Sequence, residues 1–204
     1  MRVLFYAVRH GETTLNTANK FRGPIDIKLS DQGRKQATEA GKILKDVPAS
    51  LIVHSEKHRT RETARTIAKH QKDTKVPVTG TVKLRSWNLG EFAGKPKNKA
   101  NLKKLQEYID DPSKTVPKGE SLNDFKNRVN PVFNDVLFHA AVGHIPILVV
   151  HASVIHEIGT VFNGDEQSVL VDPGGIVAVV EDNGKIHAEI VHRPDGHEAG
   201  GIGG

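Results

Sequence analysis

The chain has 204 residues, 37% hydrophobic and 26% charged, a length that supports one sizeable hydrophobic core but not a large multidomain assembly. Cysteine is absent, which excludes a disulfide framework, zinc–thiolate and iron–sulfur sites and a cysteine nucleophile. The 29 Lys and Arg exceed the 24 Asp and Glu by a mild surplus spread along the chain, so we expect no nucleic-acid partner.

The first apolar segment indicates a buried strand. Val3–Val8 is a continuous run of β-branched, aliphatic and aromatic residues, which is typical of a strand covered on both faces. The run is far shorter than the roughly 20 residues of a membrane span. No small-residue cleavage site of a signal peptide follows it. We therefore expect a soluble, cytoplasmic protein without a membrane partner.

Two strand–helix units are predicted in the first third of the chain. Ser30 is the expected N-cap of a helix whose apolar residues recur at helical spacing as far as Leu44. Leu51–Val53 is a second short apolar strand, and a helix over Thr60–His70 follows it.

The middle of the chain predicts an excursion from the core. Lys95–Pro117 is rich in Lys, Asn, Asp and Pro, and it holds a predicted helix over Asn98–Ile109 with little apolar content. We expect this excursion to cover a site. Its basic stretch, Lys95–Lys104, is interpreted as a solvated helix face rather than as a docking surface for an acidic partner.

The second half of the chain again alternates helices and strands. In order, we predict a long helix, a clearly buried strand, a helix and a terminal hairpin: residues 119–136, Ile145–Val150, Val154–Val161, and Gly175–Val180 with Lys185–Val191. The turn of the hairpin is Asp182-Asn183-Gly184, a sequence that favours a tight two-residue connection.

This alternation predicts an α/β fold, a three-layer α/β/α sandwich with a mainly parallel central sheet. We expect a single catalytic domain over residues 1–192, with the excursion at about 95–117. Residues 193–204 contain five glycines and are predicted to form a flexible tail.

Basic side chains gather where the most apolar strands end. His10 follows the first strand after Arg9, and His151 directly follows the strand at Ile145–Val150. Ligand sites in such folds lie beyond the carboxyl ends of strands. Arg22 is on the irregular segment before the first helix, and Arg59 is where the second strand turns into its helix. Guanidinium groups match phosphate oxygens, and a neutral imidazole can attack phosphorus. The pattern therefore predicts phosphoryl transfer through a phosphohistidine, with ordinary surface or capping residues as the alternative.

The motifs around these residues resemble a known family. Val8–Thr13 (VRHGET), followed by Asn16 and Phe21–Gly23, is similar to the signature of the histidine phosphatase superfamily, the phosphoglycerate-mutase-like enzymes. The resemblance continues in the family's order over most of positions 3–160, through residues 29–37, 55–64, 119–128 and 149–155. It implies the phosphoglycerate-mutase-like form of the predicted fold.

The resemblance also implies roles for individual residues. His10 becomes the nucleophile that is phosphorylated, and Arg9, Arg59 and His151 bind the phosphoryl group. These four residues are the catalytic set that we expect.

A second set is implied around the substrate. Asn16 and Arg22 complete the phosphate contacts, Glu12 holds the loop or orients the imidazole, and Thr13 presents its hydroxyl or amide to the substrate. The resemblance implies no metal and no cofactor, because Arg and His supply the positive charge that Mg²⁺ gives in kinases.

One departure from the family concerns the proton donor. The family usually carries an acidic residue in a segment like Leu84–Gly94, and Ser86 occupies that position here. Some members have an Asp directly after the second His, where this chain has Ala152. Glu91 and Glu120 remain candidates for the general acid. The sequence does not choose between them.

We expect a metal-independent phosphatase that hydrolyses a small phosphomonoester through a phosphohistidine at His10. One alternative is phosphoglycerate-mutase-type phosphoryl transfer, which the short chain disfavours because a mutase needs an enclosed pocket with extra insertions. The other is a catalytically weak phosphate-binding or interaction module, suggested by Ser86. The oligomeric state stays open.

Two further features have competing interpretations. The histidines at 151 and 156, or at 187, 192 and 197, suggest a metal site only weakly, because neither set has the four-residue spacing that aligns two His on a helix. Trp87, the only tryptophan, lies either against the substrate or half-buried at a loop edge.

Overall fold

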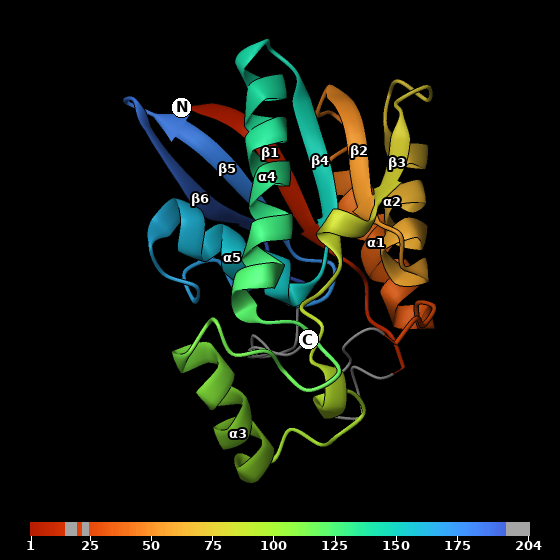
Figure 1. The fold of residues 1–204 in the computed structure, drawn as a ribbon. Coiled ribbons are helices and arrows are strands. Elements are labelled where there is room, and N and C mark those ends of the chain that lie inside the picture. Colours follow the sequence, from red (N-terminus) through yellow and green to blue (C-terminus); the bar gives the residue numbers. More distant parts are fainter. Residues whose placement is uncertain (15–19, 22–24, 195–204) are drawn as a thin grey trace.

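The computed structural model describes residues 1–14, 20–21 and 25–194. At its centre is a six-stranded sheet with the order β3-β2-β4-β1-β5-β6 (Figure 1). The strands are β1 Arg2–Arg9, β2 Ala49–Ser55, β3 Val78–Thr81, β4 Ile145–Val150, β5 Ile176–Asp182 and β6 Lys185–His192. β1 to β4 are parallel, and β5 runs antiparallel to both β1 and β6. The predicted sheet and its terminal hairpin are confirmed.

Helices cover both faces of the sheet. α1 Asp31–Ile43 and α2 His58–His70 lie on one face, and α4 Leu122–Ala141 and α5 Ala152–Asn163 lie on the other (Figure 1). Alternate residues of β4 point to opposite faces of the sheet. Ile147 therefore packs in the core beneath α1 and α2, and Leu148 packs in the core beneath α4 and α5. The predicted three-layer α/β/α sandwich is therefore confirmed.

The helix starts follow their capping residues. Ser30 is the N-cap of α1, as predicted, and its hydroxyl accepts a hydrogen bond from the Gly33 amide at 3.0 Å. Ser121 and Asp124 form a capping box at the start of α4. His151 is the N-cap residue of α5 and makes no side-chain capping bond, so its imidazole is available for other contacts.

Some elements differ from the sequence predictions. β3 and two short 3₁₀ segments, Val82–Leu84 and Gly90–Phe92, were not predicted. Trp87 is only 3% exposed, so the half-buried interpretation of this residue is wrong. Of the predicted glycine-rich tail, residues 195–204 lie outside the described residues.

α3 Lys99–Asp110 lies beyond the end of the sheet where β1 and β4 finish (Figure 1). Its buried Leu105 belongs to the hydrophobic core that also contains Trp87. Among the helices that the structure describes, none combines the length and apolar character needed to cross a bilayer.

Two glycines meet where the loop after β1 crosses the first turn of α1. A Cβ on Gly33 would lie 2.0 Å from the Glu12 carbonyl oxygen, and one on Gly11 would lie 2.2 Å from the Gly33 carbonyl oxygen. Only backbone displacement relieves such contacts. We expect Gly33→Ala to lower the free energy of unfolding by about 1–3 kcal/mol, because it overpacks this crossing. Urea denaturation measures the change.

The sign of that effect is diagnostic. Gly→Ala inside a helix normally stabilises it by up to about 1 kcal/mol. Lys35→Ala, on the exposed side of the same helix, is the matched control, and we expect a change within about 0.5 kcal/mol. A stabilised Gly33→Ala variant would contradict the close approach.

Candidate active site

His10 directly follows Arg9, the last residue of β1, and its side chain is 1% exposed. Its backbone N–H donates to the Val150 carbonyl at 3.0 Å, so the ladder between β1 and β4 continues into the site. Its Nδ1 lies 2.7 Å from the Gly11 carbonyl oxygen, which can only accept, so Nδ1 carries the ring proton. Nε2 therefore keeps its lone pair. Nε2 accepts a hydrogen bond from Arg59 Nε at 3.2 Å.

Arg59 comes from the first turn of α2 and is 2% exposed. A second hydrogen bond, from its Nη1 to the Ile25 carbonyl at 2.9 Å, fixes the guanidinium beside His10. Burial lowers the pKa of Arg59 to about 10, and Asp26 and Glu56 offset part of this shift. The group is therefore a cation at neutral pH, held against the nitrogen that we expect to react.

His151 completes the centre from the end of β4. Its ring centroid lies 5.2 Å from that of His10, with the two rings inclined at 68°. Its Nε2 lies 2.7 Å from Ser55 Oγ, at the end of β2. Ser55 is fully buried and was not among the expected site residues. It could have been found by the rule that pointed to the two histidines, since it too ends an apolar strand.

Arg9 is the last residue of β1 and is 3% exposed. Its Nη1 donates to the Val171 carbonyl at 2.8 Å. Burial lowers its pKa to about 10, and Asp172 offsets part of this shift. The Nε of Arg9 is buried, and no residue in the described part of the chain accepts a hydrogen bond from it. Arg9 is thus a charged group with one unused donor, anchored on the loop at Val171.

Glu12 contacts helix α1. Its carboxylate accepts a hydrogen bond from Ser30 Oγ at 2.7 Å, and its backbone N–H donates to Gln36 Oε1 at 2.8 Å. These bonds hold the loop that follows His10 against the helix. Thr13 is fully buried and forms an isolated bridge with Leu29. Asn16 and Arg22 lie outside the described residues.

A cavity of about 290 Å³ opens beside Arg59. Its lining includes four basic side chains and one acidic one: Lys57, Arg59, Arg85, Arg128 and Glu120. We call it the basic cavity. Ser86, which occupies the expected position of the acid, also lines it. The positive charge and the size suit the phosphorylated end of a small molecule.

The two candidate acids are occupied by other contacts. Glu120 accepts hydrogen bonds from Arg128 Nε at 3.1 Å and Nη2 at 2.5 Å, and from the Asn88 amide at 2.8 Å. The Glu120 carboxylate and the Arg128 guanidinium therefore hold each other in a two-bond ion pair. Glu91 is 45% exposed and lies 3.6 Å from Lys118. Neither carboxylate makes a contact that would present a proton beside His10.

Comparison with known proteins assigns the chain to a protein family. Residues 5–185 match the histidine phosphatase superfamily (branch 1). The chain belongs to this superfamily. Its members include phosphatases and phosphoglycerate mutases, and their common mechanism passes through a phosphohistidine.

Two curated relatives and one solved structure illustrate the range of this superfamily. The chain is 29% identical to 2,3-bisphosphoglycerate-dependent phosphoglycerate mutase 1 of Gloeobacter violaceus, over 74% of this chain and 80% of the relative. It is 34% identical to fructose-2,6-bisphosphatase TIGAR of Bos taurus, over 65% of this chain but only half of that protein. A phosphoglycerate mutase structure from Bacillus anthracis superposes with a TM-score of 0.75 at 25% identity, covering 92% of this chain and 91% of the other. The predicted phosphoglycerate-mutase-like fold is confirmed.

The histidine phosphatase fold thus brings His10, Arg59 and His151 together, as the sequence predicted. Within residues 1–14, 20–21 and 25–194, no group of three His, Asp or Glu side chains is placed to hold a metal ion.

Proposed function

We propose that this protein is a metal-independent phosphatase that hydrolyses a small phosphomonoester through a phosphohistidine at His10. The observation that carries the proposal is the state of the His10 ring. Its proton is held on Nδ1 by the Gly11 carbonyl, and its Nε2 lone pair lies 3.2 Å from Arg59 Nε, which also lines the basic cavity. The proposed nucleophile and a phosphate-binding cation therefore lie within hydrogen-bond distance of each other.

In the first step, His10 Nε2 attacks phosphorus and the bond to the alcohol oxygen breaks, so that oxygen leaves with the bonding electron pair and takes up a proton from the solvent. Arg59 then donates to the phosphoryl oxygens instead of to Nε2. We assign His151 and Arg9 to the same phosphoryl group, together with Asn16 and Arg22. The Gly11 carbonyl stabilises the positive charge that the ring gains on phosphorylation.

In the second step, water attacks the phosphorus of the phosphohistidine. The bond between phosphorus and nitrogen breaks, its electron pair returns to His10 Nε2, and the water gives up a proton to the solvent. Free phosphate leaves.

A cytoplasmic location, the absence of nucleic-acid and membrane partners and the single domain over residues 1–192 stay predictions.

A second candidate function is a catalytically weak phosphate-binding or interaction module. The specific observation that favours it is the missing proton donor, since Ser86 replaces the usual acid and Glu120 is clamped by Arg128. Turnover of 4-nitrophenyl phosphate by the purified protein separates the two functions, because this substrate releases a stable phenolate without an acid. A phosphatase hydrolyses it, and a module only binds it.

The same assay tests independence from metal. We expect turnover to persist unchanged in excess EDTA, because fixed guanidinium charge stabilises the transferring phosphoryl group. A preparation dialysed against buffer without chelator is the control. Loss of turnover in EDTA that a divalent ion restores would show that a metal takes part.

A further inference from the structure

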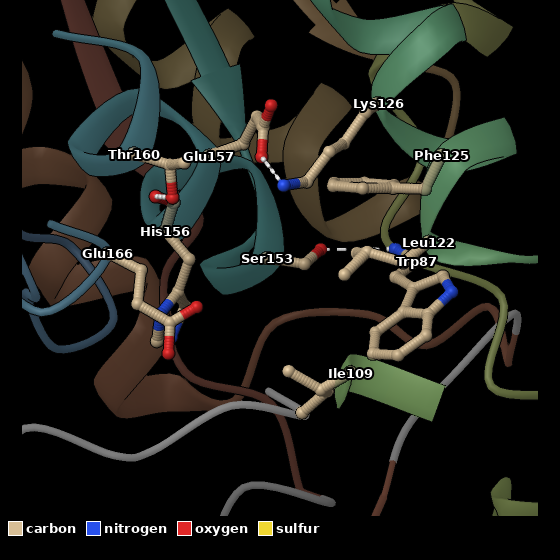
Figure 2. Close-up of a pocket in the computed structure, with 10 residues that line it drawn as sticks. All are labelled: Trp87, Ile109, Leu122, Phe125, Lys126, Ser153, His156, Glu157, Thr160 and Glu166. Carbon is tan, nitrogen blue, oxygen red and sulfur yellow. Dashed lines mark hydrogen bonds and ion pairs between the residues drawn. The ribbon is translucent and has the colours of Figure 1, made fainter. Parts of the chain in front are cut away.

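A second pocket adjoins the basic cavity and differs from it in character. Ser86 lines the basic cavity, and its Oγ lies 3.1 Å from Ser153 Oγ. Ser153 in turn lines the second pocket (Figure 2), which we call the α5 pocket. Ser153 is in the first turn of α5, two residues after His151. The hydrogen-bonded pair Ser86 and Ser153 therefore separates the α5 pocket from the basic cavity.

The walls of the α5 pocket are mainly apolar. Trp87, Ile109, Leu122 and Phe125 surround it from α3, α4 and the segment after β3 (Figure 2). The Trp87 backbone N–H donates to Ser153 Oγ at 3.1 Å, and its indole N–H donates to the Glu120 carbonyl at 3.2 Å. These two bonds fix the indole as a wall. The cavity volume of about 40 Å³ leaves room for a group the size of about three water molecules.

One polar side chain of the α5 pocket lacks an ordinary partner. His156 is 5% exposed, and within the described residues neither ring nitrogen makes a hydrogen bond of normal geometry. Burial, followed by the charge of Arg9, lowers the pKa of His156 to about 4, although the Glu166 backbone offsets part of that shift. The imidazole is therefore neutral at physiological pH. A neutral imidazole offers one hydrogen-bond donor and one acceptor.

The charged side chains of the α5 pocket are mostly acidic. Glu157 is 4% exposed, and burial raises its pKa, while Lys126 at 3.7 Å acts against this rise (Figure 2). Glu166 also lines the pocket. A second phosphate or a carboxylate would meet these carboxylates in a poorly hydrated space. The basic cavity is thus lined mainly by cations, whereas the described residues that line the α5 pocket carry no surplus of positive charge with which to bind a second anion.

We propose that the α5 pocket binds the alcohol portion of the substrate, a short uncharged chain whose hydroxyl group hydrogen-bonds to His156. This inference rests on the proposed phosphatase function and gives its substrate class: monophosphate esters of small, uncharged alcohols. Phosphoglycerates, which carry a carboxylate, are disfavoured by the same charges. The α5 pocket therefore favours hydrolysis over mutase-type transfer.

Trp87 provides a direct reporter, because it is the only tryptophan in the chain and it lines the α5 pocket. The experiment titrates the wild-type protein with non-hydrolysable alkylphosphonates, from methyl to hexyl, and follows tryptophan fluorescence. We expect affinity to rise by about fourfold for each methylene that enters the pocket, and then to level off within three or four carbons. Inorganic phosphate is the control that occupies the basic cavity alone.

Substituted phosphonates test the polar end. We expect 3-hydroxypropylphosphonate to bind more tightly than propylphosphonate, and 2-carboxyethylphosphonate to bind at least tenfold more weakly than propylphosphonate. His156→Leu should remove the gain from the hydroxyl group, and His156→Gln should restore it, since the amide keeps a donor and an acceptor. A merely structural role for His156 would affect all three ligands equally.

A wall variant tests the location. Leu122→Phe narrows the α5 pocket, so the affinity for propylphosphonate should fall to that for methylphosphonate. Leu102→Phe, at a 43% exposed position on α3, is the matched control and should preserve the chain-length dependence. Equal affinities along the whole alkyl series, with unchanged Trp87 emission, would overturn the proposal.

The two proposals fail separately. If the protein hydrolyses 4-nitrophenyl phosphate but shows no chain-length dependence, the α5 pocket proposal is wrong and the phosphatase function stands. If it hydrolyses no phosphomonoester but binds the phosphonates in the expected order, the pocket is correct and the phosphatase function is wrong.

Discussion

His10→Ala is expected to abolish turnover of 4-nitrophenyl phosphate, with a loss of roughly 10⁴–10⁶-fold in kcat, as for other enzymes that lose a covalent nucleophile. No other imidazole of the described residues is placed with an Nε2 lone pair against Arg59. The variant should also fail to incorporate phosphate in the acid-labile form that marks phosphohistidine. Steady-state assays and rapid quenching with labelled substrate measure the two effects.

A matched control is available at the opposite end of the sheet. His144 is exposed and directly precedes β4, whereas His151 directly follows this strand. His144→Ala should retain both turnover and labelling. A His10→Ala variant that turns over at close to the wild-type rate would show that the phosphohistidine mechanism is wrong.

The second large effect concerns the leaving group. Without a proton donor, an alkoxide departs more slowly by roughly 10²–10⁴-fold, whereas a phenolate leaves readily. We expect kcat/KM to fall steeply as the pKa of the leaving alcohol rises. Glu120→Gln and Glu91→Gln should not steepen the series, because their carboxylates contact Arg128 and Lys118. The measurement is kcat/KM for a set of aryl and alkyl phosphates.

Ser86→Glu turns this expectation into a gain of function. Ser86 lines the basic cavity, so a carboxylic acid at this position should accelerate the alkyl phosphates by about 10²-fold or more while changing the aryl phosphates little. Ser86→Gln is the control of the same size without a transferable proton. A flat wild-type series would mean that an acid is already present, and a steeper series in one Gln variant would identify it.

The central part of the fold could be predicted because its strands are buried on both faces. β1 and β4 contain continuous apolar runs, and once these runs indicate an α/β fold, the polar residues that follow them indicate the position of the site. Ser30 and the Asn183–Gly184 turn were likewise local signals; both turn residues have positive φ, as the predicted hairpin requires.

The remaining features depend on contacts that no local pattern encodes. β3, with the sequence VTGT, is an edge strand of four residues, too short and too polar to show periodicity. The bond between Ser55 and His151 joins residues 96 positions apart. The Arg9 contact with Val171 and the Arg128 clamp on Glu120 also require the folded chain. The serine at the family's usual acidic position could be read from the sequence at Ser86, but the α5 pocket beside it could not.

The pairing of β1 has a consequence for how the protein acquires its activity. β1 is the first strand of this sheet in chain order, yet its neighbours are β4 and β5, so that Tyr6 pairs with Ile147 on one side and with Ala178 on the other. During synthesis, the strand that leads to His10 must wait until β4 and β5 have emerged from the ribosome. Such long-range pairing is intrinsically slow. A nascent chain that ends before β4 therefore lacks both His151 and the strand beside which His10 is held, so phosphoryl transfer can begin only after β4 has been synthesised.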